Sequence, residues 1–89
     1  MREIRLFPEV VTDWPLWDDE GDDTSAEALG LSPQLAERLI RWNDMWQTCR
    51  DPIRGWRRES DRSAWEAGRP RLVRALAAEL RGVATVIDG

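Results

Sequence analysis

The sequence has no histidine, no lysine and no tyrosine, and it has one cysteine among its 89 residues. Without histidine or lysine, the chain cannot form a Ser-His-Asp triad, a Cys-His pair, a Schiff-base lysine or a P-loop. A single thiol also excludes an internal disulfide and a Cys/His zinc site. Carboxylates remain available for acid–base chemistry, but no pattern fixes a pair of them in a cleft. We therefore expect a protein that is not an enzyme and that uses no cofactor and no metal.

Long hydrophobic runs are also missing. No apolar stretch approaches the roughly 18 residues that a membrane helix needs, and residues 1–7 lack the hydrophobic core of a signal peptide. The free Cys49 fits a reducing compartment. The sequence thus predicts a cytoplasmic protein without a membrane partner. Its 89 residues leave room for one small domain, spanning residues 1–89.

The net charge of −4 hides an uneven distribution along the chain. Residues 1–31 hold two arginines and nine acidic residues, a charge of −7, whereas residues 32–89 hold 11 arginines and eight acidic residues, a charge of +3. Acidic residues are densest at 18–23, and arginines are densest at 50–74. A uniformly basic nucleic-acid binder has a different distribution, so we expect a dipolar molecule.

The first part of the chain predicts two strands, a loop and a short helix. Residues 3–7 alternate between polar and apolar, and residues 13–17 form a second extended segment because a proline disfavours a helix there. The acidic residues 18–23 surround a glycine and form a loop. A capping-box pattern at residues 24–27, followed by Gly30, predicts a single helical turn.

A longer amphipathic helix starts at Ser32 and Pro33, because serine is a favoured N-cap and proline is favoured in the first helical position. Apolar residues recur from there at spacings of 4, 3, 4 and 3, which places them on one face of a helix of about four turns. Asp51-Pro52 ends this helix. The apolar stripe consists of Leu35, Leu39, Trp42, Trp46 and Cys49.

The second long helix is expected to start at a capping box over residues 63–66, or nearer Ser60, and to end at Gly82. Pro70 lies inside its pattern and should kink the helix or divide off a piece of roughly residues 71–81. Residues 83–87 are β-prone and predict a final strand. The apolar stripe of this helix consists of Trp65, Gly68, Leu72, Leu76 and Leu80.

These elements follow the order strand, strand, helix, helix, strand. The simplest architecture is α+β: a small three-stranded sheet of β-β-α-α-β order, covered on one face by two antiparallel helices. The first and last strands can pair at the centre of this sheet. Residues 50–59 are expected to be an arginine-rich connection between the helices.

The acidic loop is the first candidate for a binding site. Its carboxylates suit either a plain solvated loop or a surface for a basic partner. An EF-hand alignment fails, because its first ligand position falls on Leu16 and no helix precedes it, which leaves a weak Ca²⁺ or Mg²⁺ site as a third alternative. The candidate residues of this loop are Asp18, Asp19, Asp22 and Asp23.

An arginine- and tryptophan-rich segment is the second candidate. Guanidinium groups beside a stacking ring can hold RNA or single-stranded DNA. The same groups can contact a protein partner, or they can form a cation–π contact and ion pairs with the acidic loop of their own molecule. The acidity of the whole protein argues against strong non-specific DNA binding. The candidate residues are Arg54, Trp56, Arg57 and Arg58.

The six tryptophans are the third feature, because a core of this size does not readily bury six indoles. Three of them lie on the helical stripes and are expected in the core. The other three are Trp14, Trp17 and Trp56, which lie in short or irregular segments. Trp14 and Trp17 are three residues apart, so one of the two should be partly exposed. Exposed tryptophan and arginine are enriched at binding hot spots, which favours an interface around these residues.

Several motifs of the chain resemble those of a group of small uncharacterised bacterial proteins. They are Trp-Pro-Leu-Trp at residues 14–17, the acidic loop, Leu-Gly-Leu-Ser-Pro-Gln-Leu at residues 29–35, Leu-Ala-Ala-Glu-Leu at residues 76–80 and the closing strand. The resemblance covers most of the chain. It implies a stand-alone domain, and it implies no activity and no functional residues.

Our leading hypothesis is a non-enzymatic protein-interaction module that binds a protein partner through exposed tryptophan and arginine. One concrete version is a small acidic regulator or toxin-neutralising inhibitor that covers a basic site with residues 18–23. The alternatives are an RNA or single-stranded nucleic-acid contact through residues 50–62, and a structural homo-oligomeric subunit. The composition is compatible with either a monomer or a homodimer.

Overall fold

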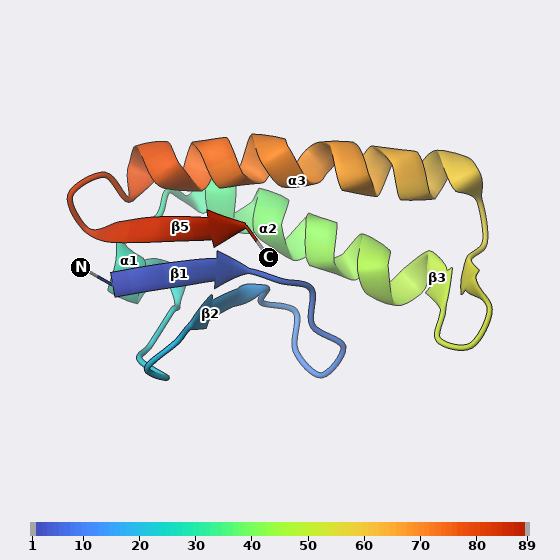
Figure 1. Ribbon diagram of the computed structural model, residues 1–89, viewed down its shortest axis with the longest axis horizontal. Coiled ribbons are helices and arrows are strands. Elements are labelled where there is room, and N and C mark those ends of the chain that lie inside the picture. The colour runs from blue at the N-terminus through green and yellow to red at the C-terminus, as the bar shows by residue number, and fades with distance from the viewer. Residues whose placement is uncertain (1, 89) are drawn as a thin grey trace.

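The computed structural model describes residues 2–88 and has an α+β fold, shown in Figure 1. The predicted order of strands and helices is confirmed, with one addition between the two long helices. Within the described residues, no helix has both the length and the apolar character needed to cross a bilayer. The elements are β1 (Arg2–Leu6), β2 (Leu16–Asp18), α1 (Ala26–Leu29), α2 (Pro33–Thr48), β3 (Arg50–Asp51), β4 (Gly55–Trp56), α3 (Glu59–Glu79) and β5 (Ala84–Asp88).

The main sheet has the strand order β2-β1-β5. β1 lies in the centre and runs antiparallel to β2, with Ile4 opposite Asp18. β1 also pairs with β5, in parallel, with Ile4 opposite Val86. The first and last strands therefore pair as expected, but the expected central position is wrong for the last strand, because β2 pairs with the other side of β1 and leaves β5 at an edge of the sheet. β2 starts later than the predicted segment 13–17, because pairing begins where the Phe7 N–H donates to the Pro15 carbonyl oxygen at 3.0 Å.

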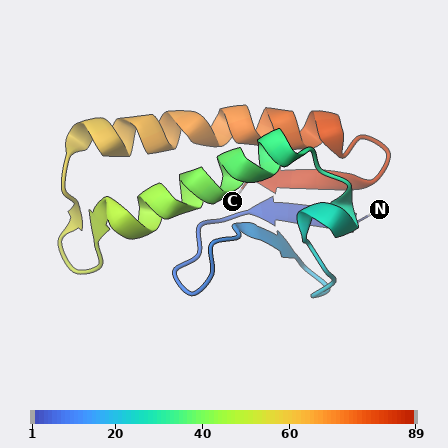
Figure 2. The ribbon, with the colours of Figure 1, turned by 180° about the vertical axis from the view of Figure 1, so that it is seen from behind.

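One face of the sheet carries the helices, and the other face carries none. Ile4 and Leu6 face the helices and are fully buried. Glu3 and Arg5, which alternate with them along β1, point to the other face. Figure 1 looks onto the open face, and Figure 2 shows α1 and α2 in front of the strands. The predicted α+β class, with two antiparallel helices over one face, is confirmed.

α2 begins where the sequence predicts. The Ser32 hydroxyl accepts a hydrogen bond from the Leu35 N–H at 3.2 Å, and Pro33 occupies the first turn. Glu79 near the end of α3 accepts bonds from the Ser32 N–H and hydroxyl, both at 2.7 Å, and so ties the two helices together. The predicted apolar stripe is buried at Leu35, Leu39 and Trp42 and half-buried at its C-terminal end.

α3 differs from its prediction in two ways. It is one helix from Glu59 to Glu79, so the expected division at Pro70 is wrong. Pro70 lies on the exposed side, where water can satisfy the carbonyl group that the proline leaves without a donor, and apolar residues pack on the core on both sides of it. The start at a capping box over residues 63–66 is also wrong, and the alternative start nearer Ser60 is confirmed, because the helix begins at Glu59 with Arg58 as an N-cap that makes no side-chain bond. Glu59 and Asp61 in the first turn offset the helix dipole instead.

Residues 50–59 contain a small antiparallel hairpin that the sequence analysis did not predict. It pairs Arg50 with Trp56 and Asp51 with Gly55. The Asp51 carboxylate accepts bonds from the backbone N–H groups of residues 53 and 54, at 2.8 and 2.9 Å, and closes the turn. Gly55 has a φ of 83°, a left-handed conformation that favours glycine.

Two tryptophans clamp α2 to α3. The rings of Trp42 and Trp65 stack with centroids 4.4 Å apart and an interplanar angle of 8°. Each indole N–H donates to the backbone carbonyl oxygen of the other residue, both at 2.9 Å. Gly68 makes room for this arrangement, because a Cβ atom at that position would lie 3.3 Å from Trp42 Cδ1. The prediction that these two tryptophans belong to the core is confirmed.

Candidate functional site

Four large apolar side chains are exposed on one short stretch of the chain. The exposed fractions are 49% for Phe7, 65% for Val10, 84% for Val11 and 42% for Trp17. Single exposed apolar residues are ordinary on a protein surface, but a contiguous group marks a candidate interaction site. We call Arg5, Phe7, Val10, Trp17 and Asp19 the Trp17 surface, because all five line one open hollow of about 690 Å³.

The indole of Trp17 is held in place although it is exposed. Its Nε1–H donates to the Phe7 carbonyl oxygen at 3.0 Å. Arg5 lies opposite Trp17 in the sheet register, and its guanidinium is 3.5 Å from the Asp19 carboxylate. That ion pair is long and half-exposed, so solvent screens it and neither charge is firmly committed. The predicted exposure of one of the two neighbouring tryptophans is confirmed, and it is Trp17.

The loop that carries Val10 and Val11 is fixed from beneath by α2. Asn43 is fully buried, and its Oδ1 accepts from the Glu9 N–H at 2.7 Å, while its Nδ2 donates to the Glu9 and Thr12 carbonyl oxygens at 3.1 and 2.9 Å. Gln47, one turn later, donates to the same two oxygens, each at 2.7 Å. The sequence analysis missed Asn43 as a positioning residue. The available signal was a polar residue four positions after Leu39, on the buried face of the helix.

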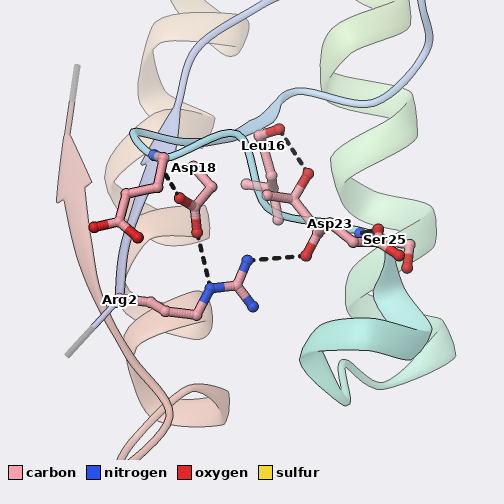
Figure 3. A network of polar contacts seen from close by, with 7 residues as sticks. Arg2, Leu16, Asp18, Asp23 and Ser25 are labelled. Atoms are coloured by element: carbon pink, nitrogen blue, oxygen red, sulfur yellow. Dashed lines mark hydrogen bonds and ion pairs between the residues drawn. The ribbon is translucent and has the colours of Figure 1, made fainter.

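The acidic loop is bonded into the protein through two of its carboxylates (Figure 3). The Asp18 side chain is 3% exposed; it accepts from Arg2 Nε at 2.8 Å and from the Glu20 N–H at 2.7 Å. Arg2 Nη2 also donates to the Asp23 carbonyl oxygen at 2.9 Å. The Asp23 carboxylate in turn accepts from the Ser25 N–H at 2.9 Å. Arg2 therefore holds both ends of the loop.

These bonds favour the charged form of both carboxylates. The backbone N–H of Glu20, and after it the Arg2 side chain, lower the pKa of Asp18 below its ordinary value. The backbone N–H of Ser25 does the same for the pKa of Asp23. Asp18 and Asp23 thus have structural bonds within the loop. Asp19 and Asp22 stay exposed, and the described residues contain no group of three potential metal ligands.

Trp14 lies apart from the Trp17 surface. Its ring is half-buried against the core, and its Nε1–H donates to the Thr24 carbonyl oxygen at 2.7 Å. The Thr24 hydroxyl donates in turn to the Leu16 carbonyl oxygen at 3.0 Å. Trp14 therefore connects the loop before β2 to the segment that leads into α1. It is absent from the hollow of the Trp17 surface, but it lines a neighbouring hollow together with Trp17 and Asp22.

The second candidate segment forms the opposite end of the molecule. We call residues 50–58 the basic hairpin. Trp56 is half-buried, with its ring centroid 6.2 Å from that of Trp46 and 5.5 Å from that of Trp65. Arg50 lies over the Trp46 ring, with Cζ 3.7 Å from the centroid. The hairpin is therefore supported by an aromatic cluster that continues the clamp between α2 and α3.

Three arginines of the basic hairpin are exposed: Arg54, Arg57 and Arg58. Arg57 Nη1 donates to the Thr48 carbonyl oxygen at 2.9 Å, and none of the three forms an ion pair with a described carboxylate. Among the described residues no ion pair links these arginines to the acidic loop, so that part of the alternative is wrong, whereas Trp56 and Arg57 do make other contacts within their own molecule. The two segments lie at opposite ends of the long axis, and the loop uses Arg2 and Arg5 instead.

A comparison with known protein families gives a match over most of the chain. A family model described as Serratia CdiI immunity protein-like matches residues 2–87, nearly the whole chain. None of the curated proteins compared with the chain matches it. The match agrees with the resemblance to a group of small bacterial proteins. Its description also names an immunity protein, which the residues alone do not indicate.

Proposed function

The chain belongs to the Serratia CdiI immunity protein-like family, and from this premise we propose that it is an immunity protein that binds and neutralises a protein toxin. Neutralisation by binding needs no catalytic group, which agrees with the residue types that the chain lacks. The family supports the toxin-neutralising hypothesis over a nucleic-acid contact and over a structural subunit. A 1:1 complex that covers the working surface of the toxin is sufficient for this function.

The toxin contact centres on the Trp17 surface. The observation that carries this proposal is the indole of Trp17, which is 42% exposed and yet fixed by its bond to the Phe7 carbonyl oxygen. A ring that is already ordered loses little conformational entropy on binding, and tryptophan is the residue type most typical of binding hot spots. Phe7 and Val10 extend the apolar area beside it.

The exposed carboxylates near the Trp17 surface indicate which kind of toxin surface is complementary to it. Asp19 lies at the rim of the Trp17 surface, and Asp22 lies further along the acidic loop, both exposed. Carboxylates around an apolar centre attract a basic surface and speed up its association. The proposed complementary surface on the toxin is therefore apolar in its middle and basic on the side of the acidic loop.

The test is rescue of growth, followed by a binding measurement. The chain is co-expressed with the candidate toxin encoded beside its gene, and the toxin from which it rescues growth is purified. Trp17→Ala should weaken the affinity for that toxin about 30-fold or more, the effect of losing a hot spot. Ile40→Ala is the matched control, because Ile40 is a similarly exposed apolar residue on α2, and it should change the affinity less than about twofold.

The outcomes separate the function from the site. If the unchanged chain neither rescues growth nor binds any neighbouring toxin, the proposed function is wrong. If it rescues growth but Trp17→Ala binds as tightly as the unchanged chain, the function stands and the Trp17 surface is the wrong site.

A further inference from the structure

We propose that the toxin contact continues from the Trp17 surface onto the basic hairpin, where Arg54, Arg58 and Ile53 bind an acidic surface of the same toxin. This inference rests on the proposed function and specifies its partner: a protein whose interface is basic at one end, apolar in the middle and acidic at the other end.

The two surfaces are continuous. Trp46 lines the same hollow as Phe7, Val10 and Trp17. The other contacts of Trp46 lead to the hairpin, because Arg50 stacks on its ring at 3.7 Å and Trp56 packs against it at 6.2 Å. A partner that covers the Trp17 surface and extends along the long axis of the molecule therefore meets the hairpin next.

Asp51 partly offsets the charges of Arg50 and Arg57 within the basic hairpin, but it does not pair with the exposed Arg54 or Arg58. The chain has 17 acidic residues, yet none of the described carboxylates forms an ion pair with an arginine of residues 50–58. The nearest carboxylate in sequence is Asp51, and it accepts hydrogen bonds from the N–H groups of Ile53 and Arg54 instead. Arg50 Nε is buried without a hydrogen-bond acceptor among the described residues. The exposed guanidinium groups of Arg54 and Arg58 are therefore available to carboxylates of a partner, for which their planar donors are suited.

The tip of the hairpin favours a protein over a nucleic acid. Ile53 is 94% exposed, beside Arg54, and the turn beneath it is fixed by Asp51. An apolar side chain between cations fits a recess in an acidic protein surface. Stacking of bases needs an open aromatic face, but Arg50 covers a face of Trp46, and Trp56 packs against Trp46 and Trp65.

A partner whose interface is basic at one end and acidic at the other is favoured in one orientation only. Reversing it would place its basic end against the arginines and its acidic end against Asp19 and Asp22, and like charges placed together in an interface are costly. The basic hairpin then contributes to specificity among related toxins as well as to affinity.

The experiment uses the full chain and the toxin identified by growth rescue. Arg54→Glu/Arg58→Glu should weaken toxin affinity at least tenfold, and Ile53→Ser should weaken it about fivefold without a change of charge. The matched control is Arg74→Glu/Arg81→Glu, which changes the net charge equally on two exposed arginines, one in the second half of α3 and one in the turn after it. It should change the affinity less than threefold. A fluorescent single-stranded RNA provides a second probe at low salt, and unfolding curves establish that each variant is folded.

Each outcome supports or overturns the inference. Selective loss of toxin affinity in the hairpin variants supports it. Equal effects of the two double variants overturn it, and so does RNA binding that depends on Arg54 and Arg58 while toxin affinity is unchanged. In these cases Trp17→Ala still reports on the proposed function. If the unchanged chain does not bind the toxin, the proposed function fails, and this inference fails with it.

Discussion

The acidic loop and the basic hairpin are held in place by different interactions. In the acidic loop, Asp18 and Asp23 accept hydrogen bonds from backbone N–H groups, and Asp18 also pairs with Arg2. In the basic hairpin, Trp56 packs against a cluster of rings, and Arg50 lies flat on one of them. The charged groups that anchor the acidic loop are bonded within the protein, so they are not available to a partner. In the hairpin, Asp51 and Arg57 also make hydrogen bonds within the protein, but the support from the rings leaves Arg54 and Arg58 without an ion pair among the described residues.

The formal charge of a segment is therefore a poor guide to the number of charged groups that a partner can contact. Two of the four aspartates singled out in the acidic loop are bonded within the protein, and Asp19 and Asp22 remain on the surface. All three exposed arginines of the hairpin remain without a carboxylate partner among the described residues.

The largest expected effect comes from removing a ring on which the hairpin rests. Trp65→Ala should lower the free energy of unfolding by about 3–5 kcal/mol, because it leaves a cavity beside Trp42, Trp46 and Trp56 and breaks the clamp between the long helices. Urea unfolding followed by circular dichroism measures it. Trp17→Ala is the control, expected to cost less than about 1 kcal/mol because Trp17 is outside the core. Similar losses for the two variants would contradict the aromatic account of the hairpin.

A smaller effect is expected from removing the cation that holds the acidic loop. Arg2→Met breaks the bonds to Asp18 and to the Asp23 carbonyl oxygen, so amide hydrogen exchange should speed up at Glu20 and Ser25. The pKa of Asp18 should rise toward its ordinary value, because the Arg2 contribution is lost. The hairpin amides of Ile53 and Arg54 should exchange as before. Loosening of both segments together would show that they are not independent.

Arg41→Met is the matched control for this variant. It removes another arginine from a salt bridge, the exposed pair with Glu37 on α2, without touching the acidic loop. Exchange at Glu20 and Ser25 should then equal that of the unchanged chain.

The smallest of the three effects is expected from acid, which should destabilise both the acidic loop and the basic hairpin. Backbone N–H groups lower the pKa of Asp18, Asp23 and Asp51 in the folded state. Their stabilising contribution is present above the ordinary value of 3.8 and is lost as the pH falls below it, through the lowered folded-state pKa. Carboxyl NMR titrations should show all three midpoints below 3.8. Asp51→Asn should remove the acid response of the hairpin amides alone, and a midpoint at or above 3.8 would contradict the structure.

Local signals in the sequence were sufficient for the helices and the fold class. The N-cap of α2 and its stripe of Leu35, Leu39 and Trp42 depend on residues within a few positions of one another, and they were predicted correctly. The error at Pro70 has a tertiary cause, because packing of α3 on the core sustains a helix that the local proline rule would divide. The hairpin was missed because its strands are two residues each, too short to show a period.

The candidate site depends on contacts that no local pattern contains. Asp18 is distinguished from Asp19 by Arg2, 16 residues earlier, and Asn43 reaches a loop more than 30 residues away. Composition correctly indicated that an indole would be exposed, but the bond from Trp17 to the Phe7 carbonyl oxygen follows from the sheet. The separation of the acidic loop from the basic hairpin follows from the direction of α2.

The parallel pairing of β1 with β5 has a consequence for the order in which the protein is made. Arg2 pairs with Ala84, so β5 can pair with β1 only after 82 further residues have been synthesised. At ribosomal speeds of roughly 5–20 residues per second, that interval is about 4–16 s. During it, the emerging chain has an unpaired edge on its central strand, open to other chains or to a chaperone. Only finished molecules have this edge of β1 covered, so the sheet that carries the Trp17 surface is complete only after the whole chain has been made.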